Sequence, residues 1–91
     1  MANYRLQIKP SAAKELEALP KKDRRRVVDR IQGLGTNPRP PGCEKLAGGE
    51  RYRVRQGNYR ILYIVHDADL LVVVIKVGHR REVYRYGMTT S

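Results

Sequence analysis

The chain is 91 residues long, 41% hydrophobic and 31% charged, which indicates one small globular domain over residues 1–91 and excludes a disordered chain. It has 19 Lys and Arg against 9 Asp and Glu, and the net charge of +10 favours a polyanionic partner, nucleic acid first. One cysteine and two histidines exclude an intrachain disulfide and a Cys/His metal cluster, and the lack of a long apolar run or a signal sequence predicts a cytoplasmic protein without membrane contact.

The N-terminal half reads as one strand, two helices and a loop. Apolar and polar side chains alternate over residues 3–9, the period of a half-buried strand. Pro10 suits the first turn of a helix that Pro20 ends, and a second helix over about residues 22–34 carries apolar side chains on one face. The three prolines and four glycines of residues 35–49 predict a connecting loop.

The start of the second helix is strongly basic. Its basic residues are Lys21, Lys22, Arg24, Arg25 and Arg26. Because Asp23 and Asp29 dilute this charge, we interpret the run as a solvent-exposed helix face.

The C-terminal half changes to the period of strands. Residues 51–56 alternate, Gly57 and Asn58 make a tight turn, and an apolar run to about residue 66 forms the returning strand of a hairpin. A β-branched run over residues 70–77 predicts a central strand that is buried on both faces. The order β-α-α-β-β-β, with short turns between the last three strands, predicts an α+β fold: a small antiparallel sheet with two N-terminal helices packed on one face.

Seven of the ten net charges lie in two ten-residue stretches, residues 51–60 with +4 and residues 76–85 with +3. By the period of the strand, Arg53 and Arg55 point away from the helices, and Arg60 on the paired strand shares this uncovered face. Such a face beside tyrosines suits single-stranded RNA, because guanidinium groups bind phosphates and aromatic rings stack on unpaired bases. Alternating arginines are also typical of a strand face that merely contacts water.

Residues 52–85 resemble the C-terminal half of the RelE/ParE toxin superfamily, most clearly in the segments GNYRILYIV (57–65) and VGHRREVYR (77–85). The segment KPSAAKELEALP (9–20), the basic helix and the Pro/Gly loop extend the resemblance over the whole chain. The family fold, a small antiparallel sheet with two N-terminal helices, agrees with the periodicity. RelE-like members cut messenger RNA in the ribosomal decoding site, whereas ParE-like members inhibit DNA gyrase, so the fold alone does not choose the function.

The resemblance implies roles for individual residues. Arg53 and Arg55 match the two basic positions of the family's first basic strand, and Arg60 matches the arginine of the following YR motif. Arg80 matches the arginine after the glycine, and Tyr84 resembles the base-stacking tyrosine of RelE-type ribonucleases, which gyrase-inhibiting relatives commonly lack. The residues expected to act in catalysis are Arg60, His79, Arg80 and Tyr84. Those expected to bind RNA are Arg51, Arg53, Arg55, Lys76 and Arg81.

One departure from the family affects proton transfer. The first basic strand carries arginines where RelE proper is understood to use lysines, and arginine, with a pKa above about 12, is a poor general base. Histidine is the side chain whose ordinary pKa lies near neutrality, which makes His79 the candidate proton acceptor. A packing role for His79 is the alternative.

The resemblance therefore implies the toxin of a type II toxin–antitoxin system. It implies a metal-independent, ribosome-dependent endoribonuclease without a cofactor, in which the 2′-OH of the substrate attacks the adjacent phosphate. The implied partners are messenger RNA, the ribosome with its 16S rRNA, and a cognate antitoxin whose extended segment carries acidic residues and an apolar helix face. Two alternatives stay open: a ParE-like gyrase inhibitor without catalysis, and a small basic RNA-binding protein that cuts nothing.

Overall fold

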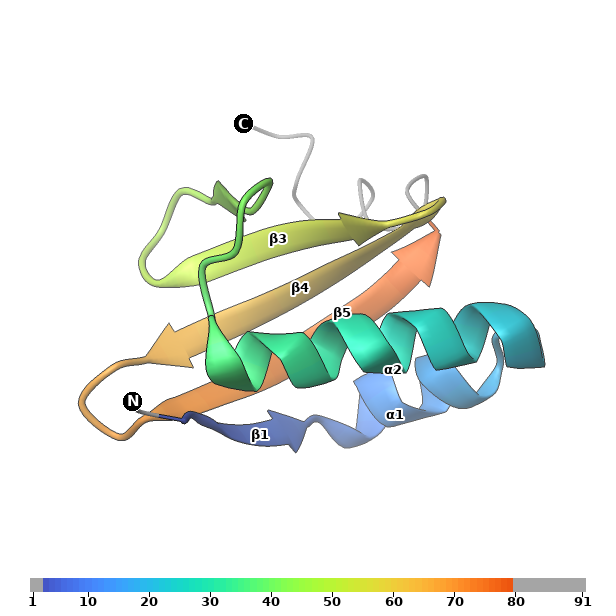
Figure 1. The fold of residues 1–91 in the computed structure, drawn as a ribbon, viewed down its shortest axis with the longest axis horizontal. Helices are drawn as coiled ribbons and strands as arrows, with labels where there is room; N and C mark the ends of the chain where they lie inside the picture. Colours follow the sequence, from blue (N-terminus) through green and yellow to red (C-terminus); the bar gives the residue numbers. More distant parts are fainter. Residues whose placement is uncertain (1–2, 80–91) are drawn as a thin grey trace.

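A five-stranded sheet with two helices on one face forms the fold of the computed structural model, which describes residues 3–79 (Figure 1). The elements follow the chain as β1 (Arg5–Ile8), α1 (Pro10–Glu17), α2 (Lys21–Thr36), β2 (Glu44–Lys45), β3 (Arg51–Gln56), β4 (Tyr59–His66) and β5 (Leu71–His79). The predicted α+β fold with both helices on one face is confirmed. Within the described residues, neither helix is long and apolar enough to cross a membrane.

The sheet has the strand order β1-β5-β4-β3-β2 and is mostly antiparallel. β2, β3, β4 and β5 pair antiparallel, as expected, whereas β1 pairs parallel with β5. The helices carry the chain from the β1 edge across one face, and the later strands return it until β5 lies beside β1 (Figure 1). The expectation of a loop throughout residues 35–49 is wrong at β2, where Glu44 and Lys45 pair with Arg53 and Tyr52.

The core lies between the helices and the sheet face that they cover. The helices contribute Ala12, Leu16, Val27, Ile31 and Leu34, and the sheet contributes Tyr52, Val54, Ile61, Tyr63, Val65, Val72, Val74 and Val77. Burying a Val, Leu or Ile side chain contributes about 1.5–3 kcal/mol to folding before the loss of conformational entropy. These side chains therefore hold the helix layer and the sheet in a fixed relation.

The burial of β5 corrects one expectation. Val72 and Val74 on the helix side are fully buried, but Leu71 and Val73, which alternate with them, are only half-buried. The prediction that this strand is buried on both faces is wrong, because the two helices cover one face and leave the other open.

A polar cluster ties the start of the chain to the β4–β5 turn. The Tyr4 hydroxyl donates to Asp67 Oδ1 at 2.7 Å, and the Arg39 guanidinium donates to the two carboxylate oxygens of Asp67 at 3.1 and 2.8 Å. Arg39 Nε also donates to the Tyr52 hydroxyl of β3 at 2.9 Å. The hydrogen bonds from Arg39 and then from Tyr4 lower the pKa of Asp67 from its ordinary 3.8 to about 2.

We expect Asp67→Asn to lower the melting temperature at neutral pH, because the amide lacks the charge that these hydrogen bonds stabilise. A group whose pKa is lowered by folding stabilises the fold above its unfolded pKa and loses that contribution as the pH falls through its folded pKa. The difference in melting temperature between wild type and variant should therefore shrink as the pH falls from 3.8 toward 2, measured by circular dichroism. Asp69→Asn, in the same turn, is the matched control and should change nothing. A difference that stays constant with pH would contradict the charge-based explanation.

Candidate functional site

Arginines gather on the open face of the sheet, opposite the helices. Arg55 on β3 lies directly across from Arg60 on β4, and Arg53 follows two residues away along β3. Tyr52 and Val54, which alternate with them, are buried in the core. The structure therefore places all three arginines on the uncovered face, as the strand period predicts.

Arg60 is the centre of this arginine group. It is 8% exposed, and among residues 3–79 it is the one charged residue that is buried, whereas Arg55 is exposed. The residue opposite Arg60 on β5 is Gly78, which has no side chain to compete for the same space. Burial withdraws the Arg60 guanidinium from water, so its electrostatic interactions with neighbouring groups are stronger than those of an exposed arginine.

Arg53 shares its charge with an acidic neighbour. Glu44 lies across from it on β2, and Glu44 Oε1 accepts hydrogen bonds from Arg53 Nε at 3.0 Å and Nη2 at 2.6 Å. This ion pair fixes the direction of Arg53 on the open face. Sequence reasoning missed Glu44, because the residue falls in a segment rich in proline and glycine that gave no sign of a strand.

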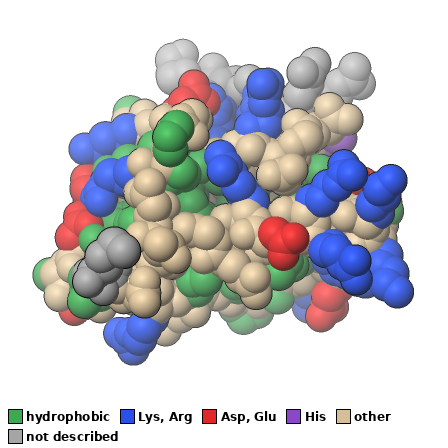
Figure 2. Space-filling view, in the orientation of Figure 1, with side chains coloured by type: hydrophobic (Ala, Val, Ile, Leu, Met, Phe, Trp, Pro, Cys, Tyr) green, Lys and Arg blue, Asp and Glu red, His purple; other side chains and the backbone are tan. Residues whose placement is uncertain are grey.

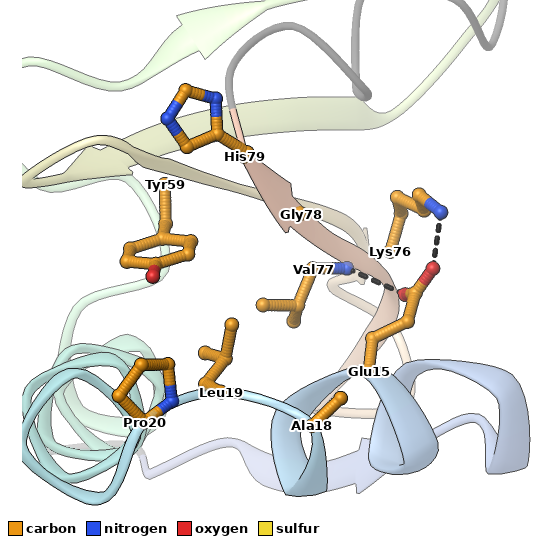
Figure 3. Close-up of a pocket in the computed structure, with 9 residues that line it drawn as sticks. All are labelled: Glu15, Ala18, Leu19, Pro20, Tyr59, Lys76, Val77, Gly78 and His79. Carbon is orange, nitrogen blue, oxygen red and sulfur yellow. Dashed lines mark hydrogen bonds and ion pairs between the residues drawn. The ribbon is translucent and has the colours of Figure 1, made fainter.

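Lys76 is held at the edge of the sheet rather than among the arginines. β1 pairs only with residues 71–74 of β5. Beyond residue 74, the edge of β5 therefore lies beside helix α1 instead of a strand (Figure 3). Glu15 of α1 forms an ion pair with Lys76 and accepts a hydrogen bond from the backbone N–H of Val77 at 2.9 Å. The Lys76 ammonium therefore helps to fasten β5 to α1.

His79 ends β5 on the helix side of the sheet. It lies across from Tyr59, with the two rings edge to face and 6.1 Å between their centroids. The Tyr59 hydroxyl donates to Asp23 at the start of α2 at 2.9 Å. Because Gly78 pairs with Arg60 and the next residue points the other way, His79 and Arg60 leave opposite faces at the same end of the sheet.

A cavity of about 350 Å³ lies beside His79, between α1 and the end of β5 (Figure 3). Its floor is apolar, and its rim carries the Glu15–Lys76 ion pair and His79. The remaining lining residues are Ala18, Leu19, Pro20, Tyr59, Val77 and Gly78.

The remaining expected site residues either lie farther from Arg55 and Arg60 or fall outside the residues that the structure describes. Arg51 is exposed on the open face and lies across from Ile64, about 13 Å along β3 from Arg55. Arg80, Arg81 and Tyr84 fall outside the residues that the structure describes. The described part of the site is therefore an exposed and a buried arginine side by side, flanked by an arginine paired with glutamate.

Comparisons with known proteins identify the class of molecule that carries this site. Residues 6–84 match the family model described as the ParE toxin of the type II toxin-antitoxin system, parDE. The chain is 33% identical over 86 residues to toxin RelG of Mycobacterium tuberculosis, covering 90% of this chain and 97% of the relative. The chain therefore belongs to the RelE/ParE family of toxins of type II toxin–antitoxin systems, which confirms the resemblance seen in its motifs.

Solved structures agree with this family. An archaeal RelE–RelB complex from Pyrococcus horikoshii matches with a TM-score of 0.78 and 32% identity, over 86% of this chain and 96% of that one. The toxin–antitoxin complex RelBE2 of Mycobacterium tuberculosis matches with a TM-score of 0.78 and 29% identity, over 88% and 94% of the two chains.

We expect Glu44→Gln to tighten the binding of a short single-stranded RNA, because the carboxylate competes with phosphate for the Arg53 guanidinium. The gain should be about two- to fivefold, the size of one exposed ion pair. Fluorescence anisotropy with an uncleavable 2′-O-methyl RNA measures it, and Glu17→Gln on α1 is the control with the same change of charge. Weaker binding by Glu44→Gln would instead mean that the carboxylate holds Arg53 in its binding position.

Proposed function

We propose that this toxin is a metal-independent endoribonuclease that cuts messenger RNA on the ribosome, in the cytoplasm. The observation that carries the proposal is the cross-strand pair of Arg55 and Arg60, in which one guanidinium is exposed and the other is buried on the open face. Planar guanidinium groups bind phosphate through two parallel hydrogen bonds, and two of them together match a phosphodiester that gains charge during cleavage.

The reaction needs few groups from the protein. The 2′-oxygen of the substrate forms a bond to the adjacent phosphorus, the bond from phosphorus to the 5′-oxygen breaks, and a cyclic phosphate and a 5′-hydroxyl remain. One proton leaves the 2′-OH and one reaches the 5′-oxygen. In this proposal Arg60 and Arg80 stabilise the charge on the phosphate and Tyr84 stacks on a base. His79 leaves the opposite face at the same end of the sheet, so it accepts a proton only from RNA that passes around this end.

The remaining basic residues serve the RNA backbone. Arg51, Arg53, Arg55 and Arg81 are proposed to contact phosphates. Lys76, whose charge is shared with Glu15, contributes only to the positive field at the edge.

The proposed partners are messenger RNA with the 16S rRNA of the ribosome, and a cognate antitoxin. The solved relatives in complex with RelB support an antitoxin partner for this chain. We expect its toxin-binding segment to place acidic side chains over the arginines, which are the strongest positive feature of the open face.

A second candidate function is gyrase inhibition, because the family model that matches is described as a ParE toxin. The two candidates predict different products. Translating ribosomes incubated with the protein and mapped by primer extension reveal new messenger RNA ends only for the ribonuclease. A DNA supercoiling assay with gyrase responds only to the inhibitor.

We expect Arg60→Ala and Arg80→Ala each to abolish growth arrest and to lower the cleavage rate by about 10²–10³, the usual cost of removing one group that stabilises transition-state charge. Circular dichroism checks that each variant folds. Because Arg60 is buried, Arg55→Ala, at an exposed position, provides an independent test of the same pair. Lys14→Ala on α1 is the control. Growth arrest at the wild-type dose by a folded Arg60→Ala protein would refute the site assignment.

We expect His79→Ala to slow single-turnover cleavage by at least about 10², while RNA binding changes little. A general base must be unprotonated to act, so the wild-type rate should fall at acid pH and the variant should lack this fall. Glu44→Gln is the matched comparison, because the Glu44 carboxylate contacts Arg53 on the open face. If the acid limb disappears in Glu44→Gln and persists in His79→Ala, the glutamate is the proton acceptor and His79 has only a packing role.

A further inference from the structure

An acidic side chain lies on the side of α1 that packs against the sheet. Ala12 and Leu16 of this helix are buried in the core, and Glu15, three residues after Ala12, falls on the same side of the helix. The Glu15 side chain is 27% exposed. A carboxylate that is partly withdrawn from water is unfavourable unless charged or hydrogen-bonding partners compensate it, and both partners of Glu15 lie on β5.

These partners lie in a part of β5 where the pairing of the sheet is interrupted. On one side, the pairing of β5 with β1 ends at Val74. On the other side, the register with β4 shifts between Leu62 and Tyr63, which leaves Ile75 as an extra residue on β5. A β-bulge of this kind bends a strand and disrupts its hydrogen bonding locally. Beyond the bulge, β4 is therefore the one strand that pairs with β5 within the described residues.

Glu15 attaches β5 to the helix layer directly after the bulge (Figure 3). Its Oε1 accepts the hydrogen bond from the Val77 backbone N–H at 2.9 Å, and its Oε2 forms the ion pair with Lys76. A backbone N–H at a strand edge without a neighbouring strand still needs an acceptor. The carboxylate of Glu15 therefore does for Val77 what a backbone carbonyl does in a strand pair.

The segment that Glu15 holds forms one side of the arginine group. Gly78, which follows Val77, lies across from Arg60, and the next residue in the sequence after His79 is Arg80. The cavity of about 350 Å³ between α1 and the end of β5 is lined by Val77, Gly78 and His79, so there is space into which this segment can shift. Loss of the attachment at Val77 would therefore move the backbone beside Arg60.

We propose that Glu15 is a positioning residue for RNA cleavage, which acts through the Val77 N–H and keeps Gly78 in place beside Arg60. Glu15 belongs to α1, whereas the strand to be cut lies on the open face, so Glu15 itself contacts no RNA. A displacement of about 1 Å far from the reacting atoms can lower a reaction rate by about 10². This inference rests on the proposed ribonuclease function and adds a residue of the helix layer on which the arginine group depends.

The test separates the reach of the Glu15 side chain from its charge. Glu15→Gln keeps an oxygen that can accept the Val77 hydrogen bond, and it should cut messenger RNA on ribosomes within about threefold of the wild-type single-turnover rate. Glu15→Asp keeps the charge but is one methylene shorter, and Glu15→Ala removes both contacts, so both should be slower by about 10- to 100-fold. Glu17→Ala, which removes an exposed carboxylate from the same helix, is the control and should cut at the wild-type rate.

Three further measurements distinguish positioning from a general loss of stability. The Val77 amide should exchange with solvent at least about tenfold faster in Glu15→Asp and Glu15→Ala than in wild type, and should stay protected in Glu15→Gln, as followed by NMR. Affinity for the uncleavable 2′-O-methyl RNA should stay within about twofold of wild type in all variants. Asp67→Asn, which loosens the turn before β5, should cut at the wild-type rate at a temperature at which circular dichroism shows it folded.

Each possible result supports or overturns the proposal. A Glu15→Asp protein that cuts at the wild-type rate although its Val77 amide exchanges faster would overturn it, because the attachment would then be lost without effect on the chemistry. A loss of rate in Glu15→Gln as large as in Glu15→Asp would overturn the role of the Val77 hydrogen bond, and an equal loss in Asp67→Asn would show that stability alone matters. A wild-type protein that leaves messenger RNA on ribosomes intact would refute the proposed function itself, and this inference with it.

Discussion

The pairing of β3 with β4 is the constraint on which the rest of the structure depends. A two-residue turn, in which Gly57 adopts a φ of +61°, sets Arg55 opposite Arg60 and Tyr52 opposite Tyr63. The first pair then lies on the open face and the second in the core. A shift of one residue in β4 would exchange its two faces, placing the Arg60 guanidinium under the helices and Tyr63 on the open face. The hydrophobic core and the arginine group are therefore fixed by the same register.

The acidic residues decide which of the basic side chains remain available. Glu44 holds Arg53, and Glu15 holds Lys76, so these two cations each have a partner inside the fold. Arg51 and Arg55 stay exposed on the sheet, and the start of α2 keeps exposed cations at Lys21, Lys22, Arg25 and Arg26 (Figure 2). The net charge of +10 is thus spread unevenly over the surface. The few acidic residues form ion pairs with particular basic side chains, and the other basic side chains stay exposed to an external anion.

Sequence reasoning succeeded where the determining pattern is local. The alternation of residues 51–56 and the turn after it predicted the hairpin and the face of Arg53 and Arg55, which the register confirms. It failed where the partner is distant: Glu15 lies 61 residues from Lys76, and no periodicity reports such a contact. The parallel pairing of β1 with β5 was missed for the same reason, since it depends on the path of the helices across the sheet.

Arg60 on the open face and the start of α2 carry positive charge on opposite layers of the molecule. Arg60 is 8% exposed and so is largely withdrawn from water, whereas the cations at the start of α2 are exposed and are repelled by the helix dipole. An anion bound at the start of α2 offsets this repulsion, and an anion beside Arg60 meets a guanidinium that water screens little. Because the two surfaces lie on opposite layers, occupying one does not by itself neutralise the other. On the proposed function, we expect an antitoxin that silences the protein to cover the open face, where Arg60 lies, rather than merely to match the net charge.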